Sequence, residues 1–430
     1  MRALLASSIG VACTAALALP LAVPAGAAAG SAPRSTAAAP AAAAPGGSTQ
    51  SLPLRPLAGS DRGATTRGLA QREVRPFSMA GVVWDEAGSE LHGRAQIRTR
   101  DARSGQWSGW RDLETHNDAP DAGSGERSRG GTAPVWVGDS DAVQARVLPE
   151  RSADRAPAAL PEGLRLELVD PGPAPAAGGH RAADGDLTAA EAAASAVNAE
   201  FAEIGATEIK AQQEAPAGPE DERAGAAADG VGPRPGIMIR RGWGANESWR
   251  ESQFRYTNTV RAAFVHHSAT GNNYSCKQAP SVIRGIYRYH TQSLKWRDIG
   301  YNFLVDKCGQ IYEGRAGGVA RAVMGAHTLG FNENSMGIAV LGTFGSATPP
   351  KDALDGVAKL TAWKLGLFRV NAKGKVTMVS GGSNKYGKGT RVTLNAISGH
   401  RDGFATECPG AKLYGSLWKV RSTAGRLQGR

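Results

Sequence analysis

The C-terminal half of the chain contains the side chains best suited to bind a metal ion, which are His266, His267, His290, His327, His400 and Cys408. His266 ends the apolar run AAFVHHSA (262–269), which predicts a buried strand with polar residues at its end. In SGHRDGFATECPG (398–410), a short polar loop separates His400 from Cys408, so both side chains can face one point. Two imidazoles and one thiolate leave the fourth tetrahedral position of a catalytic zinc site open. From the spacing alone, purely structural histidines remain an equal alternative.

The N-terminus predicts that one of the four cysteines is removed. Met1-Arg2, an apolar stretch and the small residues Ala25-Gly26-Ala27 are typical of a signal peptide over residues 1–27, with an uncleaved anchor as the alternative. Cys13 would leave with this segment. Cys276, Cys308 and Cys408 would remain, which suits one disulfide and one cysteine with another task.

Charge divides the 430 residues into two parts. Residues 1–234 contain 22 basic and 29 acidic residues, a net charge of −7, whereas residues 235–430 contain 28 and 10, a net charge of +18. Beyond the N-terminus no run of 18 apolar residues occurs, which excludes a polytopic membrane protein. The length and this asymmetry predict separate domains joined by linkers.

The first part of the chain predicts a small all-β, sandwich-like accessory domain over residues 75–170, where short strand-like runs alternate with turn residues. Its Trp107, Trp110 and Trp136 belong either to the core or to an exposed carbohydrate-binding platform. Residues 28–74 are predicted to be a disordered Ala/Pro-rich segment, and residues 171–234 a linker with a marginal helix.

Residues 235–430 alternate strand and helix patterns, which predicts an α/β domain with a mixed central β-sheet flanked by helices. Strands are expected in AAFVHHSA, YNFLVD, QIYEGR and MGIAVLGTF. Amphipathic or apolar spacing predicts helices over 278–293, 351–368 and 411–424.

Four motifs in this half, in order, are FVHHSAT, RDIGYNFLVDKCGQIYEGR, GAHTLGFNENSMGIAVLGTF and SGHRDGFATECPG. Together they resemble the superfamily of peptidoglycan recognition proteins and phage-lysozyme-type zinc N-acetylmuramoyl-L-alanine amidases, over about residues 236–422. The resemblance implies that His266, His400 and Cys408 bind one Zn²⁺. It further implies that Tyr301 is catalytic and that Thr406 assists, because Thr406 falls where the family has a Lys or Thr.

Other residues of these motifs have less defined roles. The resemblance assigns His327 to a substrate groove, and we place Asn302, Arg315 and His267 with it as substrate-binding candidates. His267 should point away from His266 across the strand, so a supporting or core role is expected rather than ligation. Glu407 is a weak candidate for a general base because its side chain should point away from that of Cys408.

Two cysteines outside the implied zinc site should form the disulfide, Cys276–Cys308, which closes a loop of about 30 residues and contributes roughly 3 kcal/mol. A pair of Cys408 with either would destroy the zinc site. His290, on the apolar face of a predicted helix, is expected in the core.

The resemblance implies a zinc amidase that hydrolyses the amide between the lactyl group of muramic acid and L-Ala in peptidoglycan. The signal-peptide pattern predicts that it is secreted, and we expect a monomer. A non-catalytic peptidoglycan-binding protein and a zinc peptidase acting on the stem peptide are the alternatives. The net charge of +18 suits attraction to anionic cell-wall polymers. Nucleic acid is excluded as a partner by secretion, not by charge.

Overall fold

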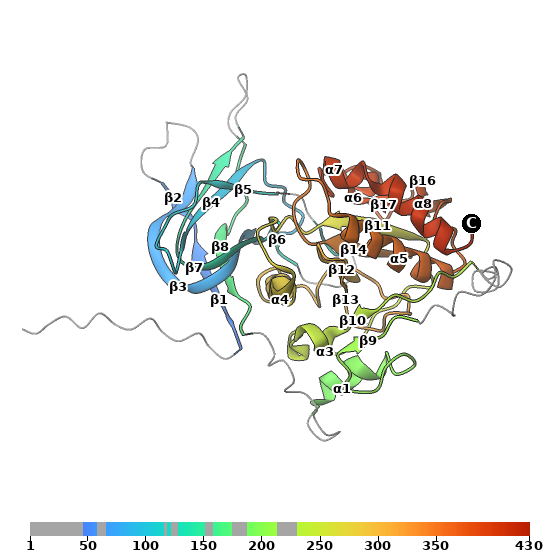
Figure 1. The fold of residues 1–430 in the computed structure, drawn as a ribbon. Coiled ribbons are helices and arrows are strands. Elements are labelled where there is room, and N and C mark those ends of the chain that lie inside the picture. Colours follow the sequence, from blue (N-terminus) through green and yellow to red (C-terminus); the bar gives the residue numbers. More distant parts are fainter. Residues whose placement is uncertain are drawn as a thin grey trace, which may run out of the picture. The chain divides into compact units, whose positions relative to one another are not determined.

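The structure is a computed structural model that describes residues 46–57, 66–115, 118–121, 128–150, 158–173, 187–212 and 230–430. The predicted signal peptide lies outside the described residues. The chain forms an N-terminal β domain followed by a C-terminal α/β domain (Figure 1). Among the described helices, none combines the length and the apolar character needed to cross a membrane.

The β domain is one antiparallel sheet in the order β1-β8-β3-β7-β4-β5, with β2 and β6 also paired to β3. Its strands are β1 (Ser48–Pro53), β2 (Arg55–Pro56), β3 (Arg67–Trp84), β4 (Gly93–Asp101), β5 (Arg111–Leu113), β6 (Gly130–Gly131), β7 (Val135–Pro149) and β8 (Arg165–Asp170). The β3–β7 pairing shifts register three times, and such bulges bend long strands. The bent strands enclose a core that includes Phe77, Trp84, Ile97 and Leu166.

Strands β1, β2 and the start of β3 lie inside the segment 28–74 that we expected to be disordered. Strand β1 pairs with β8 along its whole length, from Ser48 opposite Asp170 to Pro53 opposite Arg165. Its sequence, STQSLP, has no apolar alternation, and the strand is held mainly by its backbone pairing with β8, with Leu52 packed against the core. A prediction from hydropathy therefore places the start of this domain too late.

The three candidate tryptophans, Trp107, Trp110 and Trp136, do not form one platform. Trp136 is buried and packs against residues of the C-terminal domain. Trp107 and Trp110 are half-buried, and the guanidinium of Arg98 stacks on both rings at 5.3 and 5.4 Å.

The C-terminal domain has a mixed sheet in the order β17-β11-β14-β12-β13-β10-β9, as expected. Its strands are β9 (Glu208–Ile209), β10 (Ile237–Met238), β11 (Ala262–His267), β12 (Phe303–Val305), β13 (Ile311–Glu313), β14 (Ser335–Val340) and β17 (Ile397–Gly399). Strands β17, β11, β14 and β12 are parallel, and β12–β13 is antiparallel. A separate hairpin is formed by β15 (Lys375–Val379) and β16 (Arg391–Asn395).

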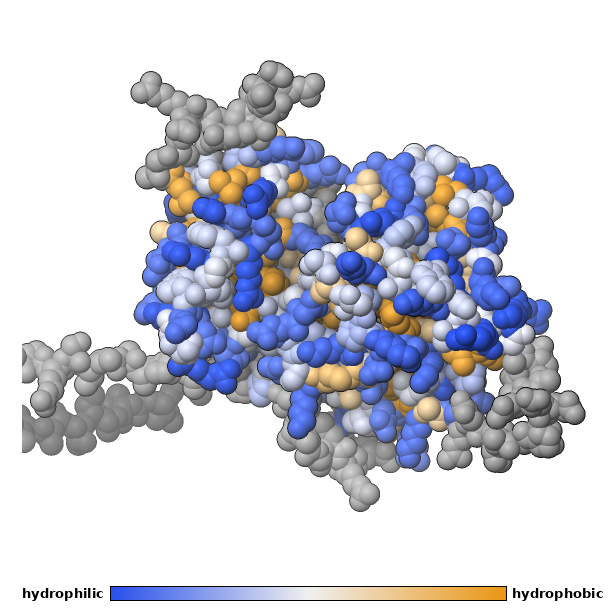
Figure 2. All heavy atoms as spheres, turned by 45° about the horizontal axis from the view of Figure 1, so that its top comes forward, coloured by the Kyte–Doolittle hydropathy of each residue, from blue (hydrophilic) through white to orange (hydrophobic). Residues whose placement is uncertain are grey.

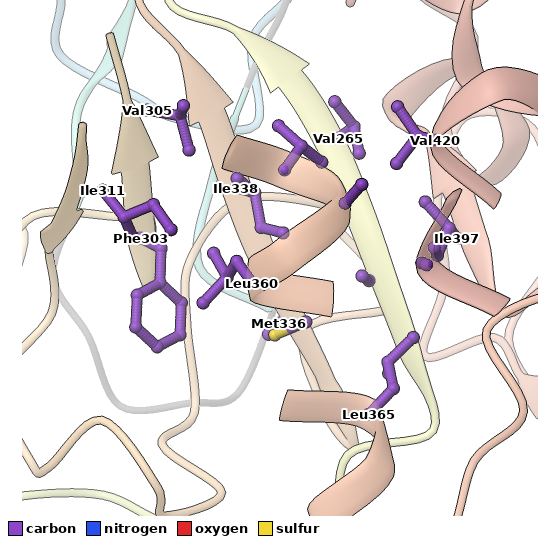
Figure 3. Packing of buried hydrophobic residues seen from close by; sticks show 14 of the residues in the cluster. Val265, Phe303, Val305, Ile311, Met336, Ile338, Leu360, Leu365, Ile397 and Val420 are labelled. Carbon is purple, nitrogen blue, oxygen red and sulfur yellow. The ribbon is translucent and has the colours of Figure 1, made fainter. Parts of the chain in front are cut away.

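Helices cover both faces of this sheet. On one face, α5 (Lys351–Leu367) and α8 (Leu417–Leu427) pack on alternate strand residues such as Val265 and Ile338 (Figure 3). On the other, α4 (Ala279–Arg288) and the π-helical turn η3 (Tyr289–Ser293) pack on Leu304 and Ala339. The remaining helices are α1 (Ala189–Ala196), α3 (Arg240–Trp243), η1 (Glu247–Trp249), η2 (Cys276–Gln278), α6 (His400–Gly403) and α7 (Ala411–Tyr414).

Part of the segment expected to be a linker belongs to the C-terminal domain. The helix expected there is α1, whose N-terminus is capped by Thr188 and Glu191. The buried side chain of Asn198 then donates to the Glu313 carboxylate at 3.1 Å and accepts from the backbone N–H of Val319 at 2.9 Å. These long-range contacts could not be read from the Ala-rich sequence around them.

Helix α4 and turn η3 also connect the two domains. The Tyr289 hydroxyl donates to the carbonyl of Thr132 at 3.0 Å, and Met79 of β3 joins the apolar cluster around Ile283 and Ile286. Because these contacts are buried, they fix the β domain beside the edge of the α/β domain that carries His266.

The face of the molecule drawn in Figure 2 is mainly hydrophilic, with small separate apolar areas.

Candidate metal centre

The sheet topology brings the three predicted metal ligands to one place. Strands β11 and β17 are parallel neighbours, with Val265 opposite Gly399. The next residues, His266 and His400, therefore lie side by side at the C-terminal ends of these strands. The loop after α6 returns the chain and places Cys408 beside them. Parallel strands thus present their C-terminal ends, and the side chains there, to a common site.

One nitrogen or sulfur atom from each of His266, His400 and Cys408 lies within 4.8 Å of the others, and all three residues are fully buried. Cys408 Sγ is 3.8 Å from His266 Nδ1. Ordinary Zn–N and Zn–S bond lengths at a tetrahedral angle require a separation of about 3.6 Å. Burial raises the pKa of the Cys408 thiol well above its usual value, so a neighbouring cation is needed to stabilise the thiolate. The donors present therefore fit zinc.

A threonine that the sequence reasoning missed supports this centre. Thr328 Oγ1 lies 3.3 Å from His266 Nε2 and 3.0 Å from His327 Nδ1, and all three side chains are buried. By engaging Nε2 of His266, Thr328 leaves Nδ1 to face Cys408, and hydrogen bonds of this kind orient metal-binding histidines. The sequence signal was available, because Thr328 follows His327 in the GAHTLG motif.

Tyr301 lies beside the three donors. Its ring centroid is 5.4 Å from that of His266, and its hydroxyl donates to Asp118 Oδ2 at 2.6 Å. Burial, with the nearby Asp118 carboxylate, raises the pKa of Tyr301 well above its usual value. The phenol therefore remains protonated and acts as a hydrogen-bond donor at the centre.

Two acidic residues of the β domain reach this centre, and neither was predicted. Asp118 Oδ1 lies 3.1 Å from His400 Nδ1 and 3.5 Å from His266 Nδ1. Glu114 Oε2 lies 2.8 Å from His267 Nε2. No local pattern marks either residue, since their partners follow between about 150 and 280 positions later in another domain.

Thr406 and Glu407 lie on the loop that precedes the candidate ligand Cys408. The Thr406 hydroxyl accepts a 3.2 Å hydrogen bond from the backbone N–H of Cys408, which shapes the loop around the sulfur. Glu407 is 94% exposed at its side chain and pairs with Arg401 at 3.3 Å. Glu407 thus points away from the donors, in line with the expectation.

Three of the expected groove residues lie in the scaffold instead. Both ends of the Asn302 amide bind backbone groups, the carbonyl of Val323 at 2.8 Å and the N–H of Gly337 at 2.9 Å. Arg315 donates to the carbonyl of Ile299 at 2.9 Å, among other backbone carbonyls. His327 is fully buried against the ring of His266, with centroids 5.3 Å apart.

The other two predicted features are present as expected. His290 lies in the core, where it accepts from the backbone N–H of Gly300 at 3.1 Å, and burial lowers its pKa to about 3. Cys276 and Cys308 form a disulfide, and Cys408 is free.

Comparison with known proteins identifies the family. Residues 256–411 match the N-acetylmuramoyl-L-alanine amidase family, and residues 32–165 match the Rv3811 N-terminal galactose-binding domain-like family. Peptidoglycan-recognition protein SC2 of Drosophila melanogaster is 34% identical over 190 residues, which is 43% of this chain and 88% of the relative. The chain belongs to the superfamily of peptidoglycan recognition proteins and N-acetylmuramoyl-L-alanine amidases.

Further members of this superfamily are also similar to part of the chain. Peptidoglycan-recognition protein SC1a of Drosophila melanogaster is 31% identical over 160 residues, covering 37% of this chain and 73% of the relative. The solved structure of wild-type Drosophila PGRP-LB is 26% identical, with a TM-score of 0.34, and covers 43% of this chain and 94% of that one.

Proposed function

We propose that the protein is a zinc-dependent N-acetylmuramoyl-L-alanine amidase that releases stem peptides from peptidoglycan outside the cell. The observation that carries this proposal is the complete donor set of His266, His400 and Cys408, with the Tyr301 hydroxyl beside it. A protein that only binds peptidoglycan would not need a buried thiol between two imidazoles. The disulfide Cys276–Cys308 supports an oxidising location.

Each group has a defined task in this reaction. A bound zinc ion would act as a Lewis acid on the scissile carbonyl and lower the pKa of water toward about 7. The Thr328 hydroxyl lies 3.3 Å from His266 Nε2, and by accepting a hydrogen bond from that nitrogen it would favour the tautomer that offers Nδ1 as a ligand. Tyr301 is protonated and buried, so its hydroxyl can donate to the carbonyl oxygen as negative charge develops there. Thr406 fixes the loop that carries Cys408.

The test is the composition of the products released from purified peptidoglycan, measured by mass spectrometry together with the zinc content of the protein. Because Asp118 faces the ligand atoms, the wild-type chain and an Asp118→Ala variant are compared, each with and without Cys408→Ser. We expect peptides that begin with L-Ala, and their loss together with zinc in the Cys408→Ser variants. Cleavage only between amino acids of the stem would favour a peptidase. Binding without products from any variant would favour a recognition protein.

A further inference from the structure

A short segment of the β domain lies directly over the candidate metal centre. It comprises the described residues 114–115 and 118–121, which follow β5, and we call it the covering segment. The carbonyl of Ala119 accepts from Asn332 Nδ2 at 3.0 Å. Asp121 Oδ1 accepts from the backbone N–H of Gly330 at 2.6 Å and from Asn332 Nδ2 at 2.9 Å. Thus both backbone and side-chain atoms attach the segment to the α/β domain.

The segment places the Asp118 carboxylate beside two of the three candidate ligands, at distances that suit a fourth ligand of the same metal ion. Two ligand atoms on one tetrahedral zinc ion, bound through nitrogen and oxygen, are separated by about 3.3 Å. Asp118 Oδ1 is 3.1 and 3.5 Å from the Nδ1 atoms of His400 and His266, so the observed distances bracket this value. Carboxylate oxygen is also an ordinary zinc ligand.

The second carboxylate oxygen of Asp118 binds the Tyr301 hydroxyl, which is the other group that the proposed reaction uses. Asp118 Oδ2 accepts the 2.6 Å hydrogen bond from Tyr301, and that hydroxyl is then not available to a substrate carbonyl. Glu114 similarly engages His267 at the end of β11. A single segment therefore occupies the fourth position of the candidate metal site and also engages the Tyr301 hydroxyl.

From these contacts we propose that the covering segment is a built-in inhibitor, with Asp118 as the fourth ligand of the metal in a latent state of the protein. That the segment inhibits a reaction rests on the proposed amidase function, whereas the contacts of Asp118 are independent of it. Substrate access requires the segment to leave, which exchanges Asp118 for water or a substrate carbonyl at the centre.

Tethering makes such an inhibitor effective even when the individual contacts are weak. The β domain is held beside the centre by buried contacts such as Tyr289 to Thr132 and the backbone bond from Trp136 N–H to the Thr270 carbonyl at 3.0 Å. A tethered ligand acts at an effective concentration in the millimolar range. If the covered state holds 99% of the molecules, any ligand of the centre binds about 100-fold more weakly than to the open state.

Asp118 could instead serve the reaction directly, as an acid or base beside Tyr301. The two roles predict opposite changes in turnover when Asp118 is removed. Removing an inhibitor increases ligand binding and turnover, whereas removing a reacting group decreases turnover and leaves access to the metal unchanged.

The experiment uses the full chain loaded with Co²⁺, whose visible spectrum reports the ligands of the metal. Acetohydroxamate, a small bidentate metal ligand, is titrated into wild type, Asp118→Ala and the control Asp85→Asn. Asp85 pairs with Arg165 on the β domain at 2.9 Å. We expect acetohydroxamate to bind at least 10-fold more tightly to Asp118→Ala, with a changed spectrum before ligand is added, and unchanged binding in the control.

Peptidoglycan hydrolysis by the zinc-loaded variants separates this inference from the proposed function. Tighter acetohydroxamate binding without hydrolysis by any variant retains the inhibitor and rejects the amidase. Hydrolysis by wild type, with equal acetohydroxamate binding in all variants, retains the amidase and overturns the inhibitor. A loss of hydrolysis in metal-loaded Asp118→Ala also overturns it. Should Asp118→Ala not fold, Asp121→Ala removes an attachment made to Gly330 and Asn332 rather than to the three donors, and it must shift acetohydroxamate binding in the same direction.

Discussion

The hydroxyl of Tyr301 in the α/β domain donates a 2.6 Å hydrogen bond to Asp118 in the β domain, across 183 positions of sequence. This contact joins the residue expected to stabilise charge in the reaction to the residue that covers the metal position. Loss of the Tyr301 hydroxyl should therefore remove both a donor for the reaction and an attachment of the covering segment, so its effect on the reaction is measured without Asp118.

In the uncovered Asp118→Ala background, Tyr301→Phe is expected to decrease kcat for peptidoglycan hydrolysis by about 10² to 10³, because one donor to the developing oxyanion is lost. Zinc content should stay at that of the parent, since the phenol is not among the three donors. Rates and metal content measured on the same samples check both statements. Unchanged kcat would remove Tyr301 from the reaction.

Thr328→Val should weaken zinc binding by about 10- to 100-fold, because the isosteric valine cannot hold Nε2 of His266. Competition with a chromophoric chelator measures the affinity. Thr361→Val is the matched control, since the Thr361 hydroxyl bonds only to carbonyls of its own helix α5. Equal zinc affinity in the two variants would contradict the role given to Thr328.

The sequence was most informative where the site depends on local order. His266 lies near the end of an apolar strand, His400 and Cys408 are only eight positions apart, and the parallel pairing of β11 with β17 then brings all three together. A strand pattern and a family motif carry that information without any knowledge of distant contacts.

Asn302 and Asp118 mark the limit of such reasoning. Asn302 lies in a family motif, but whether its amide faces substrate or backbone depends on Val323 and Gly337, which are 21 and 35 positions away. Asp118 lies in a polar loop whose composition resembles many others. Only domain packing gives it a position beside His400.

Replacing Cys276 and Cys308 together by Ser should decrease the free energy of unfolding by about 3–4 kcal/mol, because the disulfide closes a loop across 32 positions. Urea denaturation followed by tryptophan fluorescence gives this value. Wild type with its disulfide reduced must then have the same free energy of unfolding as the double variant. If the double variant is as stable as oxidised wild type, the bond is not a stabilising element.

Lys364 should make stability depend on pH. This lysine is 2% exposed, and its Nζ donates to the carbonyls of Val319 and Arg321 at 2.5 and 2.7 Å. Burial lowers the pKa of Lys364 to about 7 in the folded chain, against an ordinary value of 10.5 when unfolded. Between these two values the unfolded chain binds a proton that the folded chain does not. The free energy of unfolding therefore increases with pH in this window, by at most about 1.4 kcal/mol per pH unit.

Lys364→Met removes this titration and isolates its contribution from that of all other groups. Urea denaturation of both proteins at pH 7.5 and pH 9 should show wild type gaining about 2 kcal/mol relative to the variant across that interval. A neutral amine still offers two N–H groups to the two carbonyls, so the contacts persist as the proton leaves. A difference between the two proteins that is constant with pH would show that Lys364 remains charged in the folded state.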